Sequence, residues 1–368
     1  MKVSAKRITA IIFFVAFFLF VATWYYRMIL LLLAVTVFWR KSIRQWMTFH
    51  NHPRLYPIVV AILVVEVLLF MPKPDSFGRV KLYYQDEQGK RTHAPLLQCV
   101  CNAILPEEEI MNVGMYATVL GKYLPQNHVG KITTFFAPQV LSSHIPNFYA
   151  PYSALERNLN TPMSGTYAQV FYQEGIQKSH SVYVIRPKHY DSSKTYPLVV
   201  FCHGYLGNWQ LYNGIWRDLG NCIVLSIGTN DLSGIFHKKE IDSIFTRQIP
   251  FLQSLGYKID MHQLHLIGIS NGGSACRIAY ERHGNKFKSI SAISAAPSPS
   301  PEAGKRKCMV NLLGGNDCSI YPQYAKTYKA MGMDAACYYE PKDNHFFAVN
   351  HRKEMIAFLN KRMNNTVK

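Results

Sequence analysis

Ser270 is the residue whose surroundings most clearly suggest chemistry. It is the centre of a Gly-x-Ser-x-Gly pattern, Gly268 to Gly272, which follows the apolar run Leu264–Ile269 and precedes a helix-length stretch. A strand, a sharp turn and a helix in this order present a serine hydroxyl at the edge of a sheet, and glycines let such a turn form. The pattern therefore predicts that Ser270 is a nucleophile. An ordinary glycine-rich turn between a strand and a helix is the structural alternative.

A serine is a poor nucleophile at neutral pH unless a histidine takes its proton and an acid orients that histidine. Where this pattern is catalytic, the acid and then the histidine follow the serine along the chain. Asp317 comes after the apolar run Met309–Leu313 and two glycines, so we expect it at the carboxyl end of a strand. His345 lies in the loop that follows the run Ala335–Tyr339. The sequence thus predicts a catalytic triad of Ser270, Asp317 and His345.

Other side chains compete for two of these roles. Asp334 precedes a predicted strand, and Asp343 lies too close to His345 in the sequence to orient it easily. His351 begins the predicted final helix, Arg352–Arg362, where we expect it to face solvent. These three residues are therefore weaker candidates than Asp317 and His345.

Backbone N–H groups that stabilise a developing oxyanion are expected near the nucleophile. The apolar run Pro197–Cys202 leads into His203-Gly204-Tyr205, two predicted strands before the serine turn. The N–H groups of Tyr205 and Asn271 are then the predicted donors to the oxyanion. We expect His203 to be structural, with its ring bound to nearby backbone, and not to be the general base.

Short apolar runs alternate with helix-length stretches from Thr166 onward, which indicates a mainly parallel sheet covered by helices on both faces. Gln169–Gln173 and Ser181–Arg186 are expected to pair as a hairpin. Ligand sites in open sheets of this kind form at the carboxyl ends of the strands. The further predicted strands are Leu198–Cys202, Cys222–Ile227, Leu264–Ile269, Ser289–Ser294, Met309–Leu313 and Ala335–Tyr339.

Residues 166–362 resemble the α/β-hydrolase superfamily. The serine turn Ser270-Asn271-Gly272-Gly273, together with Tyr196-Pro197-Leu198-Val199-Val200 leading to His203-Gly204, is similar to the polyhydroxybutyrate-depolymerase and feruloyl-esterase branch. The resemblance implies an α/β-hydrolase fold and a carboxylic-ester hydrolase that works through an acyl-enzyme. A small-molecule or polymer ester is then the expected substrate. A peptidase or an acyltransferase would use the same triad, and a non-catalytic binding module on the same fold is an alternative of another class.

The first 72 residues predict a membrane anchor. Ile8–Trp39 is almost wholly apolar and too long for one span, whereas Tyr56–Met71 is just long enough to cross. We therefore expect two or three transmembrane helices in 1–72, membrane lipid as a partner through residues 8–71, and an integral membrane protein whose catalytic part lies outside the cytoplasm. Residues 73–165 are expected to be a linker or accessory region, and 166–368 the catalytic domain.

The chain of 368 residues carries a formal net charge of +18. Its densest basic clusters flank the apolar N-terminal segments and form no stripe on the remaining chain, so nucleic-acid binding is not expected. No phosphate-binding loop, dinucleotide fingerprint or metal-ligand spacing is present, and the predicted chemistry requires no cofactor and no metal.

Overall fold

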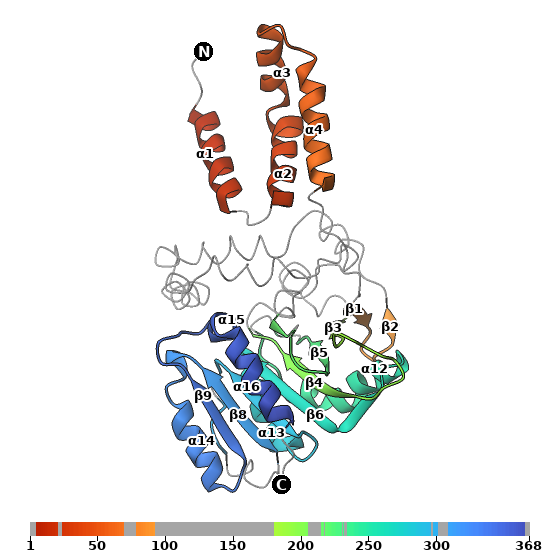
Figure 1. Ribbon diagram of the computed structural model, residues 1–368, viewed down its shortest axis with the longest axis vertical. Helices are drawn as coiled ribbons and strands as arrows, with labels where there is room; N and C mark the ends of the chain where they lie inside the picture. Colours follow the sequence, from red (N-terminus) through yellow and green to blue (C-terminus); the bar gives the residue numbers. More distant parts are fainter. Residues whose placement is uncertain are drawn as a thin grey trace. The chain divides into compact units, whose positions relative to one another are not determined.

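A computed structural model describes residues 5–20, 24–69, 79–92, 180–204, 215–216, 218–229, 231, 234–295, 297–300 and 308–364. The chain divides into two compact units. Among the described residues, those up to Leu69 belong to a helical unit, and those from Arg79 onward belong to a unit built on one large sheet (Figure 1).

The helical unit corrects the prediction of transmembrane helices and of an integral membrane protein. Its apolar helices have at most 16 residues. At about 1.5 Å per residue such a helix measures about 24 Å, against a hydrocarbon core of about 30 Å. None of the helices in the described residues is long and apolar enough to span a membrane. The helices are α1 (Ala5–Phe20), α2 (Trp24–Leu33), the π-helical turn η1 (Ala34–Phe38), α3 (Arg40–Phe49) and α4 (Leu55–Leu69).

In the described part of the second unit, nine strands form one mixed sheet in the order β2-β1-β3-β5-β4-β6-β7-β8-β9. Strands β4 to β9 are parallel to one another, and β1, β2 and β3 add an antiparallel edge. The strands are β1 (Val80–Gln85), β2 (Arg91–Thr92), β3 (His180–Ile185), β4 (Tyr196–Cys202), β5 (Ile223–Ile227), β6 (Ile259–Ile269), β7 (Ser289–Ile293), β8 (Met309–Gly314) and β9 (Ala335–Tyr339).

The six parallel strands lie where the apolar runs predicted them, within two residues at each end, except that β6 begins at Ile259 and not at Leu264. The edge differs from the prediction. The strand β3 pairs with β1, which lies about 100 residues earlier, and with β5. The expected hairpin partner, Gln169–Gln173, lies outside the described residues. Because β1 is far from β3 in the sequence, no local turn signal could have announced this pairing.

Helices cover both faces of the sheet, and the alternation of side chains along β4 shows how. Leu198 and Val200 point into the apolar core shared with the helices that follow β5, β6 and β8. Phe201 points to the other face and contacts the Trp216 ring. The helices are α11 (Lys238–Ser243), the π-helical turn η3 (Ile244–Gln248), α12 (Ile249–Ser254), α13 (Gly273–His283), α14 (Tyr321–Ala330), α15 (Phe347–Asn350) and α16 (Arg352–Asn364).

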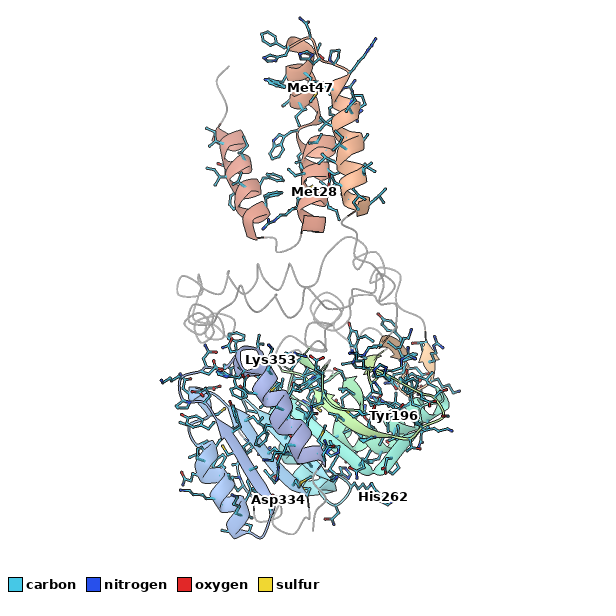
Figure 2. All side chains as sticks on the ribbon, viewed as in Figure 1. Met28, Met47, Tyr196, His262, Asp334 and Lys353 are labelled. Carbon is cyan, nitrogen blue, oxygen red and sulfur yellow. The ribbon has the colours of Figure 1, made fainter. Side chains whose placement is uncertain are left out.

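The final helix, α16, lies on the face opposite to α13 and α14. Arg362 donates from Nε to the side-chain oxygen of Asn311 at 2.7 Å, while Val310 and Leu312, the neighbours of Asn311 on β8, point into the core of the other face. Lys353, at the start of this helix, and Asp334, just before β9, lie toward opposite ends of the parallel strands (Figure 2). Because helices cover both faces of the sheet, a site is expected at the carboxyl ends of the parallel strands.

Candidate active site

The turn after β6 holds Ser270 in an unusual backbone conformation. Its φ is +53°, in the left-handed region that non-glycine residues seldom adopt. Two glycines make this turn possible because a Cβ at either would collide with backbone. A Cβ at Gly268 would lie 2.3 Å from the oxygen of Gly272, and one at Gly272 would lie 2.2 Å from the oxygen of Cys202, at the end of β4. The glycines predicted for the turn are therefore required by close contacts on both sides of the serine.

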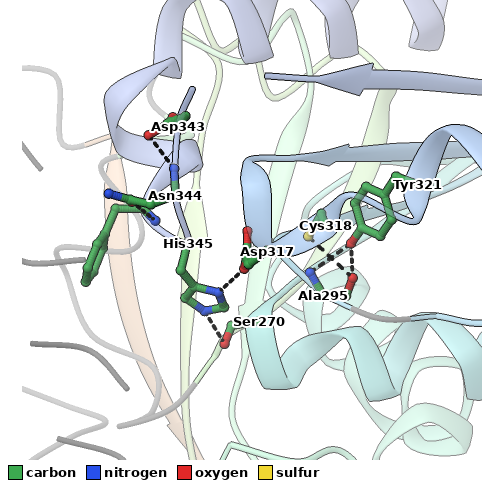
Figure 3. Close-up of polar contacts among 9 residues, drawn as sticks. Ser270, Ala295, Asp317, Cys318, Tyr321, Asp343, Asn344 and His345 are labelled. Atoms are coloured by element: carbon green, nitrogen blue, oxygen red, sulfur yellow. Dashed lines mark hydrogen bonds and ion pairs between the residues drawn. The ribbon is translucent and has the colours of Figure 1, made fainter. Parts of the chain in front are cut away.

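The structure brings Ser270, Asp317 and His345 into one hydrogen-bonded chain (Figure 3). His345 Nε2 lies 2.8 Å from Ser270 Oγ, and His345 Nδ1 lies 2.6 Å from Asp317 Oδ2. A carboxylate accepts hydrogen bonds, so Nδ1 carries the proton and Nε2 is left to accept from the serine hydroxyl. The side chains of His345 and Asp317 are only 13% and 19% exposed. This arrangement can withdraw a proton from Ser270 and stabilise the imidazolium that results.

The competing acids and histidine lie elsewhere. Asp343 binds the backbone N–H of Asn344 and the side chain of Asn350, and does not contact the imidazole of His345 in the described structure. His351 faces Asp343, with 3.4 Å between its Nε2 and the carboxylate. Asp334 forms an ion pair with Arg362 at the amino end of β9.

The turn after β6 contains one of the two predicted oxyanion donors. Asn271 follows Ser270 in a short 3-10 turn, η4 (Ser270–Gly272), that leads into α13, and its backbone oxygen accepts a hydrogen bond from the Ser274 hydroxyl. The other predicted donor, Tyr205, lies outside the described residues. His203 is fully buried, and its Nδ1 lies 2.7 Å from the Gly204 oxygen. Burial lowers the pKa of His203 to about 4, so the ring is neutral at pH 7.

Cys318, next to Asp317, is of a residue type that can act as a nucleophile, but its environment keeps it inert. Burial, followed by the charge of the neighbouring Asp317, raises the pKa of Cys318 to about 12. The thiolate is the reactive form of cysteine, so this side chain stays a thiol at neutral pH. In the described ranges, no group of three or more His, Cys, Asp or Glu side chains could hold a metal ion.

One contact that holds the segment after Asp317 in place could not be expected from the sequence. The Tyr321 hydroxyl, at the start of α14, donates to the Ala295 oxygen and accepts from the Ala295 N–H (Figure 3). It ties the segment after β7 to the helix that follows Asp317. A buried tyrosine on a helix carries no local signal for such a partner, since the partner comes from another strand.

No family model and no curated protein matches the chain. Among solved structures, a ferulic acid esterase is 13% identical with a TM-score of 0.42, and the match covers 50% of this chain and 92% of that one. The feruloyl esterase module from Clostridium thermocellum is 14% identical with a TM-score of 0.43, over 52% and 85% of the two chains. The acylaminoacyl peptidase from Pyrococcus horikoshii is 12% identical with a TM-score of 0.40, over 52% of this chain and only 40% of the peptidase.

At these identities the comparisons concern the fold alone. The parallel strands β4 to β9, the helices on both faces and a serine on a sharp turn between β6 and α13 together define the architecture. The second unit of this chain thus resembles the α/β-hydrolase superfamily in its fold.

Proposed function

We propose that the chain is a serine hydrolase that cleaves carboxylic esters through an acyl-enzyme. The observation that carries the proposal is the hydrogen-bonded chain from Ser270 Oγ through His345 to Asp317, with distances of 2.8 and 2.6 Å. Nucleophile, base and orienting acid are all within the reach that proton transfer requires. The serine turn and the His203-Gly204 segment, which resemble those of the feruloyl-esterase branch, agree with an ester substrate.

The proposed reaction has two halves that use the same side chains. Ser270 Oγ attacks the ester carbonyl while His345 Nε2 takes the hydroxyl proton, and the imidazolium is stabilised by Asp317. The tetrahedral oxyanion accepts from the N–H groups of Asn271 and Tyr205, each worth about 2.7–4 kcal/mol in such sites. The C–O bond to the alcohol then breaks as Nε2–H protonates the leaving oxygen, which gives the acyl-enzyme. Water attacks next, with His345 again as the base, and releases the acid and free Ser270.

An ester is the substrate class that makes the fewest demands on the site. An alcohol leaves more readily than an amine, so a triad that protonates its leaving group through His345 suffices for esters without further groups. The same triad can protonate an amine, but an amide is harder to cleave than an ester, and a peptidase would in addition require a surface that binds the peptide. We therefore place ester hydrolysis before peptide hydrolysis.

Labelling with a fluorophosphonate probe tests the proposal, because this reagent reacts with a serine that a base has activated. The wild-type chain should be labelled, and Ser270→Ala should not be labelled. Ser254→Ala, which removes a hydroxyl on α12 that donates to the Phe251 oxygen, is the control and should be labelled like the wild type. If the folded wild type is unreactive, or if Ser270→Ala is labelled equally, the proposed role of Ser270 is wrong. If Ser270 is the labelled residue, a screen of acyl esters and peptides separates the two substrate classes.

A further inference from the structure

Two loops at the carboxyl ends of neighbouring strands carry the base and the acid. The acid loop, Gly315–Asp317, follows β8, and the histidine loop, Asp343–His345, comes a few residues after β9. The two strands are paired in parallel, with Gly314 beside Tyr339, so the chain leaves both strands at the same level. The Asn316 N–H donates to the backbone oxygen of Asp343 at 2.8 Å, which joins one loop directly to the other.

Gly315 lets the acid loop and the histidine loop meet backbone to backbone. Its φ of −89° and ψ of −157° are accessible to any residue, so its conformation does not require glycine. Its surroundings do. A Cβ at Gly315 would lie 2.6 Å from the nitrogen and the oxygen of Asn344 and from the carbonyl carbon of Asp343. Any side chain there would push the residue just before His345 away from the acid loop.

The Asp343 carboxylate holds the histidine loop from the other side (Figure 3). This side chain is buried, and its Oδ1 accepts from the Asn344 N–H at 2.8 Å and from Asn350 Nδ2, on α15, at 2.7 Å. Its Oδ2 lies 3.4 Å from Nε2 of His351, the residue between α15 and α16. Hydrogen bonds to a charged acceptor in a buried site are among the stronger ones, so this carboxylate fixes Asn344 relative to α15.

We propose that Gly315 and Asp343 are positioning residues that set the distance between Asp317 and His345, an inference that rests on the proposed serine-hydrolase function. Neither residue contacts the reacting atoms. Gly315, which has no side chain, lets the histidine loop approach the acid loop closely. Asp343 holds the histidine loop in this position by its hydrogen bonds. Catalytic groups must be held within about 0.5 Å of their working geometry, and a misplacement of about 1 Å costs on the order of 100-fold in rate.

The test compares Gly315→Ala, Asp343→Ala and Asp343→Asn in the full chain. The measurement is the dependence of fluorophosphonate labelling on probe concentration, which separates the maximal rate constant kinact from the half-saturation constant KI. Gly315→Ala and Asp343→Ala should lower kinact about 10- to 100-fold and leave KI unchanged, because they displace His345 without altering the probe site. Asp343→Asn keeps an oxygen for the Asn344 N–H and should recover kinact to within about threefold of wild type.

Matched controls separate misplacement from general loss of stability. Gly332→Ala introduces a methyl group at φ +82° with no atom within 4 Å, in the turn before β9 and away from the triad. Asp334→Ala removes the acid that pairs with Arg362 at the amino end of β9. Both controls should destabilise the fold while kinact stays within about threefold of wild type.

The positioning roles are refuted if Gly315→Ala and Asp343→Ala label at the wild-type kinact, or if Gly332→Ala loses as much kinact as they do. If Gly315→Ala does not fold, the pair Asp343→Ala and Asp343→Asn decides, since equal losses in both also contradict the inference. A folded wild type that is not labelled would instead refute the proposed function, and this inference would fail with it.

Discussion

Replacement of Asp317 by asparagine is the most discriminating test of how the three side chains cooperate. The variant Asp317→Asn keeps the size of the side chain and removes its charge, so it leaves the backbone of the acid loop in place. In the wild type the carboxylate lies 2.6 Å from His345 Nδ1 and accepts its proton. An amide nitrogen facing the same ring would donate to Nδ1 and place the proton on Nε2. Nε2 could then no longer accept the proton of Ser270.

The expected loss can be bounded in two ways. If the amide turns its oxygen toward His345, the tautomer is kept and only the attraction between imidazolium and carboxylate is lost. Two charges about 4 Å apart at an effective dielectric constant near 20 attract by about 4 kcal/mol, which corresponds to roughly 10³-fold in rate. The low exposure of both side chains, 13% and 19%, limits screening by water. If the amide turns its nitrogen instead, the wrong tautomer costs about 10⁴-fold, as in other triads.

The assay is fluorophosphonate labelling under conditions in which the wild-type rate is proportional to probe concentration. We expect kinact/KI of Asp317→Asn to fall by about 10³- to 10⁴-fold, with unfolding temperature close to wild type. Asp334→Asn is the matched control, because it removes the charge of an acid that pairs with Arg362 at the other end of the sheet. A decrease of less than about tenfold in Asp317→Asn would refute the orienting role of this acid.

Three further substitutions test the fold and the serine turn. Gly272→Ala places a Cβ 2.2 Å from the Cys202 oxygen and should lower the free energy of unfolding by about 1–3 kcal/mol and reduce labelling, as measured by urea unfolding and the probe. Leu198→Ala, in the buried core, should cost about 2–5 kcal/mol without changing labelling of the folded fraction. Burial, with the charge of Lys288, lowers the pKa of His265 to about 3, so the unfolded chain binds this proton first as the pH falls below about 6.5. Stability contributed by the neutral ring is therefore present above pH 6.5 and lost toward pH 3. Between pH 6.5 and 4.5 the wild type should lose about 2–3 kcal/mol more than His265→Gln in urea unfolding, and equal losses would contradict the buried-histidine explanation.

Much of the parallel sheet could be predicted because its signals are local. Most of the parallel strands are short, buried and largely apolar, which is the composition of strands covered on both faces, and β6 is of this kind in its second half. The Ser270 turn was likewise readable, since its glycines and its place between a strand and a helix lie within a few residues. The chain order of serine, acid and histidine then predicted which side chains should meet, and the structure brings those three together.

The helical N-terminal unit shows where composition misleads. Hydrophobicity alone predicted spans in 8–39 and 56–71, but hydrophobicity does not fix where helices begin and end. Among the described residues, the first stretch contributes to α1, α2 and the π-helical turn η1, and the second to the 15-residue α4. Helix length depends on the backbone conformation of every residue in the stretch, which an apolar count does not report.

Contacts between distant segments were decided by the tertiary structure. The pairing of β1 with β3, the 2.6 Å distance between Asp317 and His345, and the contact of Gly315 with Asn344 all join segments that are far apart in the sequence. Sequence patterns report the conformational preference of a few neighbouring residues. Distances between residues 28 or 100 positions apart depend on which strands pair, in which order and register, and these are set by the packing of the whole sheet against its helices.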